Sequence, residues 1–180
     1  MLVSLNQTMT LAANQEEAWR LLRDTKRLAG LIPGVEGIES EYAESSGTNG
    51  VVPLEKHVAN VVERVGPFRL NLKLAVTIVR TVEPSLIEAE LNGADAKSQN
   101  RLSGTLRAEL VQDHPAETRL SVDASVEVMG KLAALGASPI RRRANELFAQ
   151  FTERLQAQFS PAGAAEAAEA PGAPEKGSAA

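Results

Sequence analysis

Cysteine is absent from the 180-residue sequence, and histidine occurs only twice, at His57 and His114. The absence of cysteine excludes disulfides, thiolate catalysis, cysteine-ligated zinc and iron–sulfur clusters. Two histidines far apart in sequence leave little for a transition-metal site. The formal net charge is −4 with acidic and basic residues well mixed, so the sequence lacks the basic footprint of a nucleic-acid-binding protein. We therefore expect no metal and no nucleic-acid partner.

Long apolar runs are also missing, and so is a recognisable targeting signal. No segment approaches the ~18 consecutive apolar residues of a membrane-spanning helix. Met1–Ser4 has neither the basic region nor the continuous apolar run of a secretory signal. We therefore expect a cytoplasmic protein. Peripheral contact with the inner face of the cell membrane stays open, because a surface contact needs neither feature.

The sequence contains none of the common catalytic or nucleotide-binding motifs. The nucleophile elbow G-x-S-x-G, the phosphate loop, the zinc motif H-E-x-x-H and the dinucleotide fingerprint are all missing. The glycines of Gly30–Gly34 do not follow a predicted strand, so they form no phosphate cradle. His114 lies in a proline-containing turn and is expected to be a solvated turn residue. We predict no catalytic residue and no covalently bound cofactor.

The most informative stretch that is present is Met129–Phe159. After Pro139 it contains no further glycine or proline, and its apolar residues recur at three- and four-residue steps. This period is typical of one helix face laid on an apolar surface. Ser138 and Pro139 suit the cap and the first turn of such a helix. The apolar stripe consists of Leu132, Leu135, Gly136, Ile140, Ala144, Leu147, Phe148, Phe151, Leu155 and Phe159.

Most of the chain before this helix alternates between apolar and polar residues, which indicates strands. The clearest run is Phe68–Val79, and Leu102–Leu110 and Leu120–Val128 have the same period of two. Short turn signals such as Val65–Phe68 and Asn92–Gly93 separate the runs. Because the turns are short, neighbouring strands are expected to be antiparallel partners. Each clean strand has one polar face, as in a sheet with one side open to water.

The sequence predicts one strand and two short helices before these strands. Ser4–Ala12 alternates loosely. Asn14 can cap a helix in which Glu17 completes a capping box, and a second short helix begins at Asp24 or Thr25. The order is then one strand, two short helices, about six strands and one long helix. This order predicts an α+β fold in which a curved antiparallel sheet wraps around the long C-terminal helix.

The chain is expected to divide into one folded domain, residues 1–159, and a C-terminal tail, residues 160–180. The tail is dominated by alanine, proline, glycine and glutamate and has no large apolar side chain. Such a segment cannot bury enough apolar surface to offset the entropy lost on ordering. We therefore predict that the tail is disordered.

The interior of such a fold has few large side chains to fill it. Aromatic residues make up 3% of the sequence, and small residues are frequent at the start of the long helix. An incompletely filled space between the sheet and the helix predicts an apolar binding cavity. Trp19, the only tryptophan, is then either plain core or a wall of that cavity.

The strand Val51–Val65 can be placed in two registers. If Glu55, His57 and Glu63 face the interior, they must be hydrogen-bonded there, and they become polar contacts for a ligand. In the opposite register these three side chains face solvent, and the inner side chains include Val52, Leu54 and Val58. The alternation in this strand does not choose between the two registers.

Three consecutive arginines, Arg141, Arg142 and Arg143, lie near the N-terminus of the long helix. Positive charge at this end opposes the helix dipole, at a cost of roughly a few tenths of a kcal/mol for each residue. This unfavourable placement suggests contact with an acidic partner surface or with anionic lipid head groups. The alternative is an ordinary solvated helix face.

Four strings of residues, spread between Ser4 and Phe159, resemble those of a known family. They are EEAWRLLRD at Glu16–Asp24, IPGV at Ile32–Val35, VGP at Val65–Pro67 and GKLAALG at Gly130–Gly136. Together with the order of elements, they resemble the G-subunit family of carbon monoxide dehydrogenase. This family lies within the START-like helix-grip superfamily of polyketide cyclases and lipid-transport proteins.

The resemblance implies a seven-stranded antiparallel sheet around a long C-terminal helix, with an apolar tunnel between them. It implies a non-enzymatic accessory protein of a molybdenum-containing hydroxylase such as carbon monoxide dehydrogenase. The protein would bind a lipophilic molecule, expected to be an isoprenoid quinone, and link the enzyme to the membrane. His57 or Glu63 would contact the head group of the ligand, and Arg141–Arg143 would contact the partner or the membrane. The tunnel would be lined by Trp19, Phe68, Leu70, Leu72, Leu102, Ile140, Leu147, Phe148 and Phe151.

Two other functions stay open at this point. A small enzyme of the cyclase or hydratase type would act on a hydrophobic substrate in the same cavity, with Glu63 and His57 as acid and base. A docking adaptor would need no ligand and would bind the hydroxylase through the three arginines.

Overall fold

Within the described residues, seven strands form one antiparallel sheet in the order β1-β7-β6-β5-β4-β3-β2. The structure is a computed structural model that describes residues 1–47 and 50–160, with side chains described outside 43–54. The predicted tail therefore lies outside the described residues from position 161 onward. The elements in chain order are β1 (Leu2–Leu11), α1 (Gln15–Arg23), α2 (Thr25–Leu31), β2 (Val35–Gly47), β3 (Gly50–Val65), β4 (Phe68–Val82), β5 (Leu86–Ala94), β6 (Arg101–His114), β7 (Glu117–Met129), the 3-10 helix η1 (Lys131–Leu135) and α3 (Ala137–Gln158).

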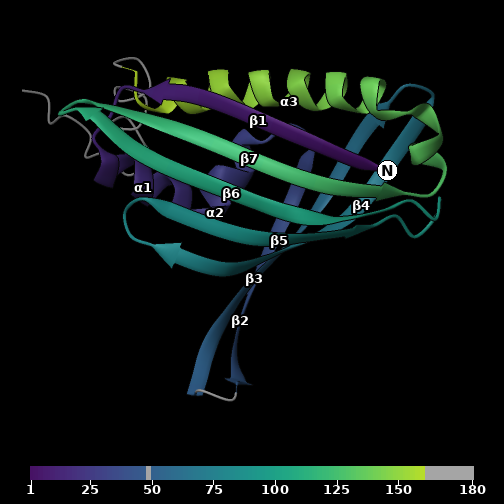
Figure 1. The fold of residues 1–180 in the computed structure, drawn as a ribbon, viewed down its shortest axis with the longest axis horizontal. Helices are drawn as coiled ribbons and strands as arrows, with labels where there is room; N and C mark the ends of the chain where they lie inside the picture. Colours follow the sequence, from purple (N-terminus) through teal and green to yellow (C-terminus); the bar gives the residue numbers. More distant parts are fainter. Residues whose placement is uncertain (48–49, 161–180) are drawn as a thin grey trace, which may run out of the picture.

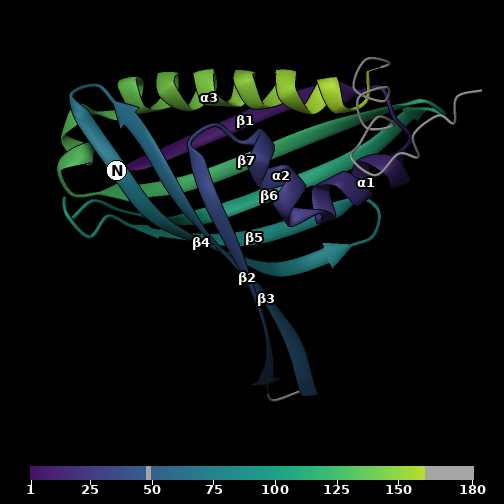
Figure 2. The same cartoon turned by 180° about the vertical axis from the view of Figure 1, so that it is seen from behind.

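The three helices and the inner face of the sheet enclose the core. Figure 1 shows α3 running alongside β1, with β7, β6 and β5 curving away from it and the hairpin of β2 and β3 projecting beyond the rest of the sheet. Figure 2 shows α1 and α2 on the side of the sheet turned away from the viewer in Figure 1. Trp19 of α1 and Leu155 of α3 pack into one buried cluster with Leu11 and Leu110 of the sheet. The predicted α+β fold, with a curved antiparallel sheet and a long C-terminal helix, is confirmed.

The two short helices form as the sequence predicts. Asn14 accepts a hydrogen bond from the backbone N–H of Glu17 at 2.9 Å, and the Glu17 carboxylate accepts one from the backbone N–H of Asn14 at 3.2 Å. This capping box satisfies donors that the first turn leaves unpaired. Asp24 caps α2 by accepting a hydrogen bond from the backbone N–H of Arg27 at 3.2 Å. Two of the predicted helix starts are therefore confirmed at the level of single hydrogen bonds.

The long helix begins earlier than predicted. It starts at Ala137, after Gly136, and no side chain caps it. The predicted cap at Ser138 is wrong, because the chain turns out of η1 at Gly136 and Ser138 is already in the first helical turn. Leu132 and Leu135, which the stripe assigned to the same helix, belong to η1. No helix in the described part of the chain is long and apolar enough to cross a membrane.

The predicted turn at Asn92–Gly93 is also wrong, because β5 continues to Ala94. Gly93 lies inside the strand, where a side chain would stand 2.9 Å from the Cγ atom of Leu102 on β6. The turn follows at Asp95, whose carboxylate accepts hydrogen bonds from the backbone N–H groups of Asn71, Lys97 and Ser98 at 3.1, 2.8 and 3.1 Å. These hydrogen bonds lower the pKa of Asp95 to about 2.

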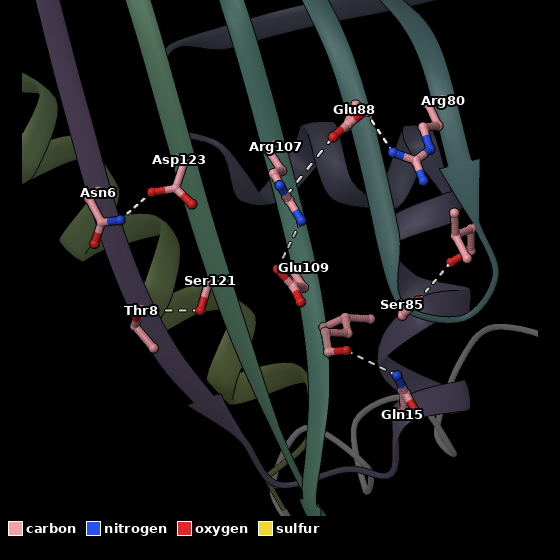
Figure 3. Close-up of polar contacts among 12 residues, drawn as sticks. Asn6, Thr8, Gln15, Arg80, Ser85, Glu88, Arg107, Glu109, Ser121 and Asp123 are labelled. Atoms are coloured by element: carbon pink, nitrogen blue, oxygen red, sulfur yellow. Dashed lines mark hydrogen bonds and ion pairs between the residues drawn. The ribbon is translucent and has the colours of Figure 1, made fainter.

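The outer face of the sheet is polar, and its side chains satisfy one another (Figure 3). Arg107 lies 4.0 Å from Glu88 and 3.4 Å from Glu109, and Arg80 reaches Glu88 at 3.7 Å. A groove of about 630 Å³ follows two rows of this face. The side chains of the two rows are Ser4, Ser125, Thr105 and Glu90, and Asn6, Asp123, Arg107 and Glu88. An apolar ligand is therefore expected on the opposite, inner face.

Candidate functional site

The inner face of the sheet carries two separate buried clusters of apolar side chains. One lies at the α1 end and the other at the η1 end. The first consists of Met9, Leu11, Ala18, Trp19, Leu21, Ile87, Leu110, Leu120 and Leu155. The second consists of Val3, Val65, Leu70, Leu72, Val128 and Leu132. The protein is therefore sealed at both ends of the inner face rather than packed uniformly along it.

A band of apolar side chains between the two clusters stays partly accessible. These residues face inward, are half-buried, and pack on neither cluster. They are Leu5, Leu74, Val76, Leu91, Leu106 and Ala124 on the sheet, with Ala144 and Leu147 on α3. We call this set the apolar band. Two of its members, Ala124 and Ala144, are small, and they leave more room than large side chains would.

The predicted lining residues are divided among these three regions. At the α1 end lie Trp19, which is buried, and Phe148 and Phe151, which pack on its cluster with ring centroids 5.9 Å apart. At the η1 end lie Phe68, Leu70, Leu72, Leu102 and Ile140. Leu147 belongs to the apolar band. That all nine line one continuous tunnel stays a prediction.

The strand β3 adopts the register that places its polar residues inside. His57 pairs with Val76 and Glu63 with Leu70, so they share the inner face with these apolar residues. His57 is only 5% accessible. Val58, which the opposite register turned inward, pairs with Ala75 on the other face. The opposite register is therefore wrong for residues 55–65, because α1 supplies a partner for the inward carboxylate of Glu55. Val52 and Leu54 lie outside the described side chains.

A continuous chain of hydrogen bonds joins Arg23, Glu55, His57 and Ser40. Arg23 Nη2 donates to Glu55 Oε2 at 2.7 Å, Glu55 Oε1 lies 2.8 Å from His57 Nε2, and His57 Nδ1 lies 2.8 Å from Ser40 Oγ. The ring of Tyr42 stands edge-on to His57 at 6.3 Å. We call the four hydrogen-bonded residues the polar chain. It links α1, β2 and β3 at one edge of the sheet.

The electrostatics of the polar chain centre on Glu55. Burial raises the pKa of this carboxyl, but the hydrogen bonds from Arg23 and His57, together with the charge of Arg23, outweigh burial, so the pKa lies below its ordinary value. Glu55 is therefore ionised at neutral pH and accepts hydrogen bonds only.

Glu63, the second predicted polar contact, is bound to α3 instead of being free. Its Oε1 atom accepts hydrogen bonds from Arg143 Nη2 at 2.6 Å and Arg143 Nε at 3.1 Å. Arg143 also donates to Glu146 at 2.9 Å. Hydrogen bonds to Glu63 and then to Glu146 raise the pKa of Arg143 above its ordinary value. Glu63 and Arg143 thus form a bridge between β3 and α3.

The three consecutive arginines are separated by this bridge. Arg143 is half-buried and paired, whereas Arg141 and Arg142 are exposed and form no ion pair within the described residues. Arg141 and Arg142 border a shallow hollow of about 520 Å³ on the outer surface of α3. The other residues of the hollow are Ser138, Asn145, Glu146 and Ala149. Only two of the three predicted contact residues are therefore available to a partner.

His57 and Glu63 are not brought together as an acid–base pair. Six residues separate them along one extended strand, which corresponds to about 20 Å. Each already has a partner of its own, on α1 and β2 for His57 and on α3 for Glu63. The geometry therefore gives no support to an enzyme that uses these two side chains on one substrate.

A family model described as CoxG, the G component of carbon monoxide dehydrogenase, matches residues 8–160. The chain belongs to the CoxG family. The structural comparisons show the fold that this family shares with START-like proteins. No curated protein matches the chain.

Solved structures of low sequence identity have the same fold as this CoxG family member. A conserved protein from Geobacillus kaustophilus has a TM-score of 0.72 at 20% identity, covering 87% of this chain and 95% of that chain. A START superfamily protein from Mycobacterium smegmatis has a TM-score of 0.64 at 17% identity, covering 87% and 96%. The Zhui aromatase/cyclase from Streptomyces sp. R1128 has a TM-score of 0.55 at 14% identity, covering 91% and 99%.

Sequence reasoning missed two members of the polar chain in this CoxG family member. Ser40 lies in β2, the strand with the weakest alternation, and Arg23 reads as an ordinary charged residue on a short helix. Their partners are 17 and 32 positions away in sequence. The only available signal was the inward register of His57, which requires partners from neighbouring elements.

Proposed function

We propose that this family member is a non-enzymatic accessory protein that binds a lipophilic molecule between the inner face of the sheet and α3. The apolar band is the observation that carries the proposal. Apolar surface that stays accessible forgoes about 25 cal/mol per Å² of burial, and an apolar ligand lying on the band regains that stabilisation. The family and its START-like fold support hydrophobic ligand binding independently.

Within this proposal the ligand is an isoprenoid quinone and the partner is a molybdenum-containing hydroxylase of the carbon monoxide dehydrogenase type. The family description supports the partner, because it names this enzyme. The alkyl chain of a quinone suits the apolar band, and its ring oxygens suit polar groups at the edge. Contact with the membrane would use the exposed Arg141 and Arg142, whose charge matches anionic lipid head groups.

Recovery of the bound molecule tests the proposal directly. The protein is purified from its native source and extracted with organic solvent, and the extract is analysed by mass spectrometry. We expect a lipophilic compound in a stoichiometric amount, and we expect ubiquinone or menaquinone to raise the thermal midpoint of stripped protein. An empty extract combined with an unchanged midpoint contradicts ligand carriage.

A matched pair of helix variants tests where the ligand lies. Ala144→Phe adds a ring to the apolar band, whereas Ala149→Phe adds the same ring on the exposed side of α3. Ligand recovery should fall at least fivefold in Ala144→Phe and stay unchanged in Ala149→Phe. Equal recovery from both variants places the ligand elsewhere.

A ligand-free docking adaptor is the second candidate function, and the unpaired charges of Arg141 and Arg142 favour it. Arg141→Glu combined with Arg142→Glu reverses these charges and leaves the Arg143 bridge intact. Loss of co-purification with the hydroxylase, while ligand recovery persists, assigns docking to this surface. Unchanged co-purification removes Arg141 and Arg142 from partner binding.

A further inference from the structure

The polar chain and the apolar band meet on one face of the sheet. Cross-strand pairing sets one row of inward side chains, which runs from Ser40 through His57, Val76 and Leu91 to Gly104. Directly paired residues of antiparallel strands point to the same side. An elongated molecule lying on the apolar residues of this row therefore reaches Ser40 and His57 at the β2 end.

The hydrogen atoms of the polar chain can be assigned by elimination. Glu55 is ionised and only accepts, so the Nε2 atom of His57 must carry a hydrogen. Arg23 already balances the charge of Glu55, so a second cation on the buried ring would lack a counter-charge, and we assign the ring as neutral. The Nδ1 atom then accepts the hydroxyl hydrogen of Ser40. The oxygen of Ser40 keeps its remaining lone pairs for another molecule.

Ser40 is also the accessible member of the chain. His57 is 5% accessible and has both nitrogen atoms occupied, whereas Ser40 is exposed on an edge strand. A ligand can therefore contact the serine oxygen but not the imidazole. Because the only hydroxyl hydrogen of Ser40 is used by His57, this oxygen accepts and does not donate.

We propose that Ser40, oriented by His57, binds the hydroxyl hydrogen of a long-chain phenol or alcohol whose hydrocarbon part lies on the apolar band. The site then discriminates by head group, since a neutral donor finds a free acceptor there. A carboxylate or an ether offers no hydrogen to Ser40. The inference rests on the proposed function and adds the chemical class of the ligand and its polar contact.

Two nearly isosteric probes separate the head-group contact from apolar binding. 4-Nonylphenol and 4-nonylanisole share the alkyl chain and ring, but the anisole has no hydroxyl hydrogen. Affinities are measured by isothermal titration calorimetry with the stripped, full-length protein. We expect the phenol to bind about three- to tenfold more tightly, the range that one net hydrogen bond supplies.

Serine variants assign this preference to one residue. Ser40→Ala should bring the phenol to the affinity of the anisole and leave anisole binding unchanged. Ser40→Thr, which keeps a hydroxyl, should retain the preference. Ser4→Ala, a matched change on the outer face of the sheet, should leave both affinities as in the native protein. Because Ser40 and Ser4 are both exposed, both alanine variants are expected to fold.

The outcomes distinguish the two proposals. Equal affinities of the native protein for both probes, or a phenol preference that persists in Ser40→Ala, overturns the head-group assignment and leaves the apolar site standing. Failure of both probes to bind overturns the apolar site and the head-group assignment together.

Discussion

Arg143 joins the long helix to the sheet through Glu63, eighty positions away in sequence. Its Nη2 and Nε atoms both donate to Glu63 Oε1, at 2.6 and 3.1 Å. The two side chains are 31% and 14% accessible, so the pair is partly shielded from water. On the other side, α3 packs along β1, as Figure 1 shows. The ion pair therefore holds the side of the sheet where the helix has few other contacts.

Removal of this ion pair should destabilise the fold. We expect Glu63→Ala to lower the free energy of unfolding by about 1–2 kcal/mol, because Arg143 is left half-buried without its main partner. Urea unfolding measures the change.

Glu146→Ala is the matched control, because it removes the second and more exposed partner of Arg143. A change below about 0.5 kcal/mol is expected there. Equal losses from the two variants would show that the bridge between β3 and α3 has no special weight.

Asp95 should make stability depend on acid pH. The folded-state pKa of about 2 lies below the ordinary value of 3.8. The stabilising contribution is therefore complete above about pH 4 and is lost as the pH falls through 2. Asp95→Asn should remove ~1–2 kcal/mol at neutral pH and flatten the acid limb of the stability curve, measured by urea unfolding between pH 2 and 7.

The exposed Asp123 provides the comparison for this measurement. Its hydrogen bond to Asn6 lies on the outer face of the sheet, as Figure 3 shows. Asp123→Asn should leave the acid limb of the stability curve unchanged. An Asp95→Asn protein with the native acid limb would contradict the assigned role of the turn carboxylate.

Local sequence patterns predicted most of the fold but misplaced two boundaries. Period-two alternation identified strands such as Phe68–Val79, because one face of the sheet is wet and the other is packed. Asn92–Gly93 is a strong hairpin signal, yet the strand continues through it. Gly93 is there to admit Leu102 from the neighbouring strand, and only the packed sheet contains that information.

The candidate site was less accessible to sequence reasoning. The stripe on α3 identified which residues face the sheet, but Ile140, Leu147 and Phe151 belong to three different regions of the inner face. A fully packed helix and a helix over an apolar band have the same stripe. The partners of His57 and Glu63 are set by long-range packing, so their roles could be assigned only once α1 and α3 were in place.

Two glycines should respond to alanine with opposite signs. At Gly130 the φ angle is +91°, and an added Cβ atom would lie 2.7 Å from the backbone oxygen of Gln99. Gly130→Ala should therefore cost more than about 1 kcal/mol. At Gly30, inside α2, an added Cβ atom meets nothing within 4 Å, so Gly30→Ala should stabilise the protein by about 0.5–1 kcal/mol. Thermal and urea unfolding measure both changes, and a neutral Gly130→Ala would contradict the described turn.

Removal of the Arg23 guanidinium should raise the pKa of Glu55. Arg23→Met keeps much of the apolar stem but removes the 2.7 Å hydrogen bond and the positive charge, while the burial that disfavours ionisation remains. The ¹³C chemical shift of the Glu55 carboxyl, followed by NMR against pH, reports the change. Because the folded-state pKa of Glu55 is depressed, its stabilising contribution is lost as the pH falls, and this loss should be smaller in the variant.

Arg20→Met is the matched change on the same helix. Arg20 pairs with Glu16 at 3.8 Å on the exposed face of α1, so its removal should leave the titration of Glu55 unchanged. If Glu55 titrates identically in the native protein and in Arg23→Met, Arg23 does not balance its charge. The assignment of a neutral ring to His57 would then lose its basis, because that assignment requires Arg23 to be the cation paired with Glu55.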